Sequence, residues 1–336
     1  MIRSIVVVSI VAAAAICSPP AQAQSLLYGL VDAAASRSRP PGGDYRYQLD
    51  NGDMSRSFIG FRGSEDLGGG LRGVFKLESY LRIDSGESGR YTGDGFWGRD
   101  SNVGLSGAFG TTVLGRTVTP FYLATVSFNP FGDSFAFSPS ARQYYMGTLV
   151  GDRSWNNSMS YSNNATDSPL RINLAANTPE EAIGAPNTGR NYGGSVAYIS
   201  GPFAATVAIE RVKNTPLPVP VEFRRQLAIQ AGASYDFQFM RLYGQVGRVK
   251  TDAASDTRTV LYQIGAAIPV GNGLILASFG SSRAGTPISQ ITDRTGSIGY
   301  DYFLSKSTDI YVAAMREKTF MLSAGGTIAG GVRMRF

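Results

Sequence analysis

The sequence predicts an all-β fold: a transmembrane antiparallel β-barrel of about 16 strands with short periplasmic turns and long external loops. Three observations lead to this fold class. Long segments alternate strictly between apolar and polar residues, the sequence opens with an export signal, and no later stretch is apolar for long enough to form a membrane helix. A chain without such helices crosses a bilayer only as a closed barrel, because every backbone polar group must then be paired within the sheet.

The first 23 residues have the pattern of a signal peptide. Arg3 supplies the positive start, and Ile5–Ile16 form an apolar run too short to span a bilayer. Ala21-Gln22-Ala23 provides the small residues of a cleavage site. We therefore expect residues 1–23 to be the signal peptide, with cleavage after Ala23. Residues 24–336 would then form the barrel domain in the bacterial outer membrane.

The clearest predicted strand runs from Leu71 to Ile83. One of its faces carries leucine, isoleucine and Phe75, whereas the other carries Arg72, Lys76, Glu78, Tyr80 and Arg82. The segment is longer than the usual soluble strand of about five or six residues. The same alternation recurs at 170–174, 203–210 and 226–234, and in the last nine residues.

The connections between predicted strands fall into two classes. Short ones are expected at 64–70, 200–202, 270–273 and 305–308, and long polar ones at 36–55, 84–95, 178–190 and 281–292. Short turns at one rim and long loops at the other are typical of an outer-membrane barrel. A soluble exported β-protein remains the alternative, since a soluble sandwich can reproduce any single segment.

Five stretches resemble the Gram-negative general porin family. They are Leu26–Asp32, Gly60–Leu71, Val103–Arg116, Tyr300–Lys306 and Arg333–Phe336. The resemblance covers essentially the whole chain after the signal, in order. It implies a homotrimer in outer-membrane lipid that admits small hydrophilic solutes by diffusion, with one external loop folded into the lumen. It also implies that the barrel-assembly machinery recognises the last strand, which ends at Phe336.

The longest connection of the first half runs over residues 117–143. Its phenylalanines make it too apolar for a solvated, disordered segment, and its prolines stiffen it. We expect it to bury these side chains against the inner wall of the barrel; packing over the barrel mouth or against a neighbouring subunit is the alternative. Asn129, Pro130, Phe131, Gly132 and Asp133 resemble the tip of the family's constriction loop.

The wall facing this loop is rich in cations. Strand parity points Arg62, Arg72, Lys76, Arg82 and Arg99 inward, together with the acid Glu78. Three further arginines complete the predicted constriction wall: Arg56 shares the parity of Arg62, Arg116 ends the strand before the loop, and Arg153 resembles a wall arginine of the family. Arg153 has the parity of lipid-facing residues, so a bulge would be needed to turn it inward.

These charges predict an anion-selective channel for small hydrophilic solutes and inorganic anions. Asp133 is the one acid between 117 and 143, and it cannot balance five or more wall cations. An alternative is that several arginines pair with Asp84, Glu87 or Asp94. A substrate-specific channel for phosphate or organic anions is the second functional hypothesis, because the same arginine wall would serve both.

Other classes of function fit the sequence poorly. The chain has no histidine, and its one cysteine lies in the signal, so no cofactor or metal site and no enzyme activity is expected; calcium held by loop carboxylates remains open. Nucleic-acid binding is not expected either, since the arginines are spread singly along strands in an exported protein. If Arg99 faces inward, parity turns Asp100 and Asn102 outward, where a subunit interface would cover them.

Overall fold

The computed structural model describes residues 24–163, 168–178, 190–213, 215, 219–286 and 289–336. Within these residues the chain forms one antiparallel sheet of 18 strands. Two of them, β2 (Arg46–Asn51) and β5 (Glu87–Ser88), are short strands inside external loops. The other 16 strands described by the structure form a closed barrel, which confirms the predicted fold class.

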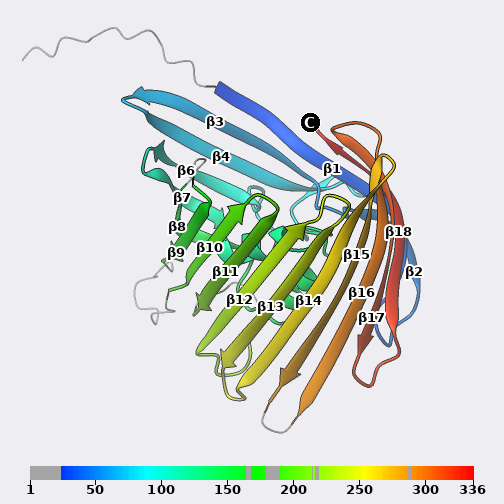
Figure 1. Ribbon diagram of the computed structural model, residues 1–336. Helices are drawn as coiled ribbons and strands as arrows, with labels where there is room; N and C mark the ends of the chain where they lie inside the picture. Colours follow the sequence, from blue (N-terminus) through cyan, green and yellow to red (C-terminus); the bar gives the residue numbers. More distant parts are fainter. Residues whose placement is uncertain (1–23, 164–167, 179–189, 214, 216–218, 287–288) are drawn as a thin grey trace, which may run out of the picture.

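Each barrel strand pairs with its neighbours in the sequence, and β1 pairs with β18 to close the ring (Figure 1). The barrel strands are β1 (Gln24–Arg39), β3 (Phe58–Gly68), β4 (Leu71–Arg82), β6 (Asp100–Gly107), β7 (Gly110–Val118), β8 (Ser154–Ser162), β9 (Leu170–Asn177), β10 (Tyr192–Ser200), β11 (Phe203–Val212), β12 (Arg225–Asp236), β13 (Arg241–Asp252), β14 (Thr257–Val270), β15 (Gly273–Gly285), β16 (Gln290–Phe303), β17 (Thr308–Thr319) and β18 (Gly325–Arg335). The two helices, α1 (Pro120–Ser127) and α2 (Pro139–Tyr145), lie between β7 and β8. No helix among the described residues is long and apolar enough to cross a membrane.

The two faces of the strands follow the predicted parity. In β12, Leu227 and Ile229 are exposed on the outer surface, whereas Gln226 and Gln230 are buried on the lumen side. An apolar outer face can meet hydrocarbon, and a polar inner face can meet water. The alternation read from the sequence therefore identifies the correct face at these strands.

Two predicted loops are shorter than expected. The segment 281–292 is mainly strand, because β15 and β16 stay paired as far as Gly285 and Gln290. The segment 36–55 also contains strand, since β1 continues to Arg39 and β2 adds to its edge. Because the external ends of these strands carry polar side chains, the sequence suggested loops there. A barrel strand can extend beyond the apolar band of the membrane, and its residues are then polar on both faces. Of the predicted loop 178–190, residues 179–189 lie outside the described part of the chain.

The seam between β1 and β18 is held by backbone pairing, and charged contacts lie beside it. The amides and carbonyls of Gly29 and Phe336 exchange two hydrogen bonds of 3.0 and 3.1 Å, so the chain terminus is paired with the first strand. On the lumen side, Arg333 donates to Asp301 at 2.7 Å and to Asp309 at 3.0 Å. These ion pairs tie β18 to β16 and β17 beside the seam.

Candidate pore constriction

The connection between β7 and β8 is an internal loop spanning residues 119–153. Each of its two helices begins with a capping residue followed by proline: Thr119 accepts a hydrogen bond from the Tyr122 amide, and Ser138 accepts one from the Ala141 amide. The loop ends ten residues later than the predicted boundary at 143, which falls within α2. Helix ends without caps would leave buried amides unpaired, so these residues fix where each helix starts.

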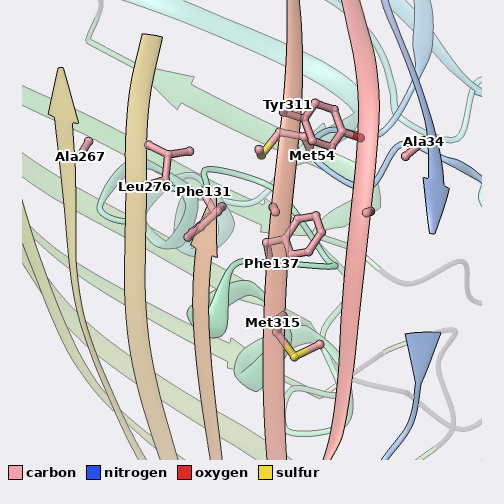
Figure 2. Packing of buried hydrophobic residues seen from close by; sticks show 10 residues of the cluster. Ala34, Met54, Phe131, Phe137, Ala267, Leu276, Tyr311 and Met315 are labelled. Atoms are coloured by element: carbon pink, nitrogen blue, oxygen red, sulfur yellow. The ribbon is translucent and has the colours of Figure 1, made fainter. Parts of the chain in front are cut away.

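Aromatic side chains of the loop pack on one side of the inner wall. Phe121 and Tyr144 lie in an apolar cluster with Ala208 on β11 and Ala228 on β12. Further along the loop, Phe131 and Phe137 pack with side chains of β14, β15 and β17 (Figure 2). Because both phenylalanines are almost fully buried, the loop is seated inside the barrel and does not cover its mouth.

Small wall residues give the loop room to approach. A Cβ atom at Gly247 of β13 would lie 1.7 Å from the hydroxyl oxygen of Tyr144. One at Gly265 of β14 would lie 2.7 Å from Cδ of Pro130. Any larger residue at these two positions would force the loop away from the wall.

Wall glutamines bind the backbone of the loop. On β12, the Gln230 amide donates to the Phe121 carbonyl at 2.8 Å; on β13, the Gln245 amide donates to the Phe128 carbonyl at 2.8 Å. Gln226 and Gln263 accept hydrogen bonds from loop amides, each at 2.9 Å. All four glutamines are buried. The side chains therefore satisfy backbone groups that the loop could not expose to water.

The loop packs against β11–β15 and β17, which we call the far wall. This leaves a cavity of about 1240 Å³ against the opposite, near wall, which is lined by strands β1, β3, β4, β6, β7 and β8. From the loop, Tyr122, Leu123, Val126 and Asp133 line this cavity. From the near wall and its connections, its charged lining residues are Arg62, Lys76, Arg99, Asp100 and Arg153. In the narrowed part of the lumen, the side formed by the loop is largely apolar and carries one acid. The side formed by the near wall is basic.

The charges in this cavity are unequally paired. Lys76 forms an ion pair with Asp100, and Arg99 forms one with Glu78. Among the described residues, neither Arg62 nor Arg153 has a carboxylate oxygen within 4.0 Å. Arg62 instead lies over the ring of Tyr28, 4.8 Å from its centroid. Two guanidinium groups therefore present charge to the cavity without a carboxylate partner in the part of the chain that the structure describes.

Arg153 is buried between two tyrosines. Its guanidinium carbon lies 4.4 Å from the ring centroid of Tyr80 and 5.2 Å from that of Tyr122, and it donates to the Tyr122 hydroxyl at 3.2 Å. Burial lowers the pKa of Arg153 and raises that of Tyr122. The bulge that an inward Arg153 requires is present: the β7–β8 register shifts between the Gly115–Ser158 and Thr117–Trp155 pairs, and Asn157 within the bulge has a φ of 50°.

The structure separates the other predicted wall residues. Arg72 faces inward but is exposed beside the short turn at Gly69-Gly70, outside the cavity lining. Arg116 does not face the cavity: it pairs with Ser101, and Asp152 binds its guanidinium at 3.1 Å. Strand parity states which face a side chain occupies, but not how far along the barrel axis it lies.

Asp100 and Asn102 correct a second expectation. Both are buried on the lumen side, where Asp100 lies opposite Glu78 and Asn102 opposite Lys76. Arg99 precedes β6, so it is free of the strand's alternation and also reaches Glu78. The outward placement was wrong because we began counting parity before the strand starts.

The predicted loop tip divides into two parts. Asn129 folds it, accepting a hydrogen bond from the Phe131 amide and donating to the Gly132 carbonyl, both at 2.9 Å. Pro130 and Phe131 face the far wall, and only Gly132 and Asp133 line the cavity. Sequence reasoning missed Tyr122 and Val126 as lining residues, although their separation by four on a proline-initiated helix is a usable signal.

A second cavity of about 370 Å³ lies on the external side of the loop, where Arg56, Arg82 and Arg90 line it. Arg56 is close to the ring of Phe135, at 4.4 Å from its centroid, whereas Arg82 pairs with Glu87. Asp53 also lines this cavity, and its carbonyl accepts a hydrogen bond from the Ser134 hydroxyl at 2.6 Å. The first external loop is thus joined to the internal loop at this point.

Asp53 makes the stability of this junction depend on pH. Burial, together with the carboxylates of Asp50 and Asp32, raises its pKa to about 7. Since the folded protein then binds a proton that the unfolded chain has released, stability falls as the pH rises from about 4 to about 7. We expect Asp53→Asn to raise the unfolding temperature at pH 8, where it adds at most about 4 kcal/mol to the free energy of unfolding. At pH 4 we expect little effect. Thermal unfolding at both pH values tests this; an equal effect at the two would contradict it.

A closed β-barrel whose polar lumen is narrowed by an internal loop has the architecture of a porin, a diffusion channel and not an enzyme. The chain belongs to the Gram-negative porin family, whose model matches residues 9–319. It is an outer-membrane β-barrel.

Relatives and solved structures agree with this assignment. Outer membrane porin protein 32 of Delftia acidovorans is 31% identical over 99% of this chain and 95% of that protein. Major outer membrane protein P.IA of Neisseria meningitidis serogroup C is 45% identical over 22% of this chain and 18% of that protein. The structure titled "Anion-selective porin from Comamonas acidovorans" has a TM-score of 0.78 and 25% identity, covering 94% of this chain and 100% of that one. The trimer form of OmpT from Vibrio cholerae has the same fold, with a TM-score of 0.72 at 13% identity, covering 94% and 99% of the two chains.

Proposed function

We propose that this porin is anion-selective and that the cavity beside the internal loop is its constriction. The observation that carries the proposal is the charge surplus there: Arg62 and Arg153 lack a carboxylate partner among the described residues, while Asp133 is the one acid of the internal loop that lines the cavity. Charges in a narrow passage with low-dielectric walls act on an ion more strongly than charges on an open surface.

Ion pairing reduces the surplus but does not remove it. Of the predicted wall cations, Lys76, Arg82, Arg99 and Arg116 have carboxylate partners in the structure. The excess of positive charge on the wall over negative charge on the loop is therefore smaller than the sequence indicates. What remains is Arg62 and Arg153 in the cavity that Asp133 also lines, together with Arg56 in the second cavity. The similarity to an anion-selective porin from Comamonas acidovorans supports the same sign of selectivity.

The proposal extends to assembly. A homotrimer would pack the flat outer face of β1 and its neighbours, where Gly29, Ala33 and Ala35 allow close approach; the trimer form of OmpT supports this. Phe336 would be the residue by which the barrel-assembly machinery recognises the last strand. Export would remove residues 1–23, which the mass of the protein isolated from outer membranes tests.

Ion substitution in single-channel recordings tests the proposed selectivity against a substrate-specific channel. A selective diffusion pore should pass chloride, phosphate and organic anions with currents that rise linearly with concentration at constant ionic strength. Saturation at millimolar phosphate or dicarboxylate, with block of the chloride current, would indicate a binding site for that anion and would replace the simple diffusion mechanism.

A further inference from the structure

Helix α1 of the internal loop is apolar on two sides. On one side, Phe121 and Ala124 pack in the apolar cluster with residues of the far wall. On the other side, Leu123 and Val126 line the cavity beside the loop, and Leu123 is 41% exposed. Their separation by three residues places them on one face of the helix. A helix that is apolar all round is normally buried, so an exposed apolar face inside an aqueous lumen calls for a functional explanation.

The near wall adds a second apolar surface beside its basic side chains. Val74 of β4 and Val113 of β7 are both cross-strand partners of Gly104 on β6, so the three residues form one row. Both valines line the same cavity as the exposed face of α1. On β1, Leu26 also lines this cavity and is the cross-strand partner of Arg62. Residues directly opposed on one face of a sheet have neighbouring side chains, so the Arg62 guanidinium is presented beside apolar surface.

Passage of inorganic anions does not explain these apolar side chains. The interior of a water-filled barrel is normally polar, and chloride gains nothing from contact with leucine or valine. A third exposed residue of α1, Ser127, donates its hydroxyl to the Leu123 carbonyl at 2.7 Å. Apolar surface in a cavity that also holds a few charged groups is typical of a site for an organic ligand. The ligand that matches both features carries one anionic group and one apolar group.

We propose that the constriction favours monocarboxylates that carry a compact, branched apolar group. The inference rests on the proposed anion selectivity and adds the class of organic anion that passes best. The carboxylate would lie at Arg62, whose guanidinium can donate two parallel hydrogen bonds to it. The apolar group would then pass between the exposed face of α1 and the row of Val74 and Val113. Contact with either surface removes apolar area of the solute from water, which favours its entry.

Anions with polar groups at both ends would pass less well. A hydroxy acid exchanges the water around its hydroxyl groups for leucine and valine side chains, which offer no hydrogen bonds. A dicarboxylate has the same disadvantage, and its second carboxylate would also meet Asp133, which lines the cavity from the loop. The two apolar surfaces therefore separate organic anions by polarity at equal charge, which charge selectivity alone does not do.

The test compares isovalerate with glycerate, which have the same charge and the same number of non-hydrogen atoms. Reversal potentials are recorded in a planar bilayer, with potassium chloride on one side and the potassium carboxylate on the other. Each permeability is divided by the mobility of that anion in water. We expect isovalerate to be favoured about fourfold, the effect of taking about one methylene group out of water. The double variant Leu123→Asn/Val126→Thr keeps both side chains branched but makes them polar, and it should lose this preference.

Met146→Gln is the matched control, because Met146 is an exposed residue of the same loop that does not line the cavity; it should keep the preference. Equal passage of the two carboxylates through an unchanged protein that prefers chloride to potassium would overturn the inference alone. A preference for potassium would refute the proposed function and the inference with it. Retention of the preference by the double variant, or its loss in the control, would show that the exposed face of α1 does not produce it. Folding of both variants is checked by their heat-modifiable migration before recording.

Discussion

Replacing Arg62 by glutamate is expected to shift the chloride-to-potassium permeability ratio toward potassium by at least about tenfold. Arg62 lines the cavity and has no carboxylate partner among the described residues. Reversing its charge would leave the cavity with more acids than free cations. Two unit charges about 4 Å apart interact by about 4 kcal/mol at an effective dielectric of 20, whereas tenfold selectivity needs only about 1.4 kcal/mol.

Arg72→Glu is the matched control for this prediction. Arg72 lies on the adjacent strand and also faces inward, but at the short-turn rim outside the cavity. Its reversal should change the permeability ratio less than twofold when reversal potentials are recorded in 0.1 M salt, where the screening length is about 10 Å. Equal effects of the two reversals would place the constriction elsewhere in the lumen.

Gln230→Leu combined with Gln245→Leu is expected to release the internal loop. The two amides donate to the carbonyls of Phe121, Thr125 and Phe128, and leucine would remove these three hydrogen bonds. A hydrogen bond contributes about 0.5–1.5 kcal/mol net, so losing three should make the detached loop about a hundredfold more populated. Trypsin cleavage after Arg142 in the folded protein measures this population, and single-channel noise reports it independently.

The control for the released loop is Gln290→Leu. Gln290 is exposed at the start of β16, away from the loop contacts. This change should leave both trypsin cleavage and channel noise at the level of the unchanged protein. If the double variant behaves like the control, the aromatic clusters alone hold the loop and the glutamines contribute little.

The sequence predicts the barrel well because period-two alternation is a local property. Leu227 and Gln230 are on the predicted faces, and the loop with Phe121 and Phe137 is buried inside the barrel as its composition indicates. Each of these inferences requires only the identity of nearby residues. The sixteen-stranded barrel follows from the same pattern repeated along the chain.

The details of the constriction depend on distant contacts that parity does not contain. Arg62 and Arg72 have the same parity, but only the register of the sheet shows that one lies at the cavity and the other at the rim. The partners of Lys76 and Arg99 belong to other strands. Arg153 faces the cavity because of a bulge between β7 and β8, and no pattern in the sequence predicts that bulge.

The reversal potential of the unchanged protein in a planar bilayer under a potassium chloride gradient tests the central claim most directly. Two arginines without a carboxylate partner among the described residues, in a cavity where the internal loop places only Asp133, predict chloride preference at 0.1 M salt. The preference should weaken toward 1 M, as the screening length falls to about 3 Å. A preference for potassium at 0.1 M would contradict the account.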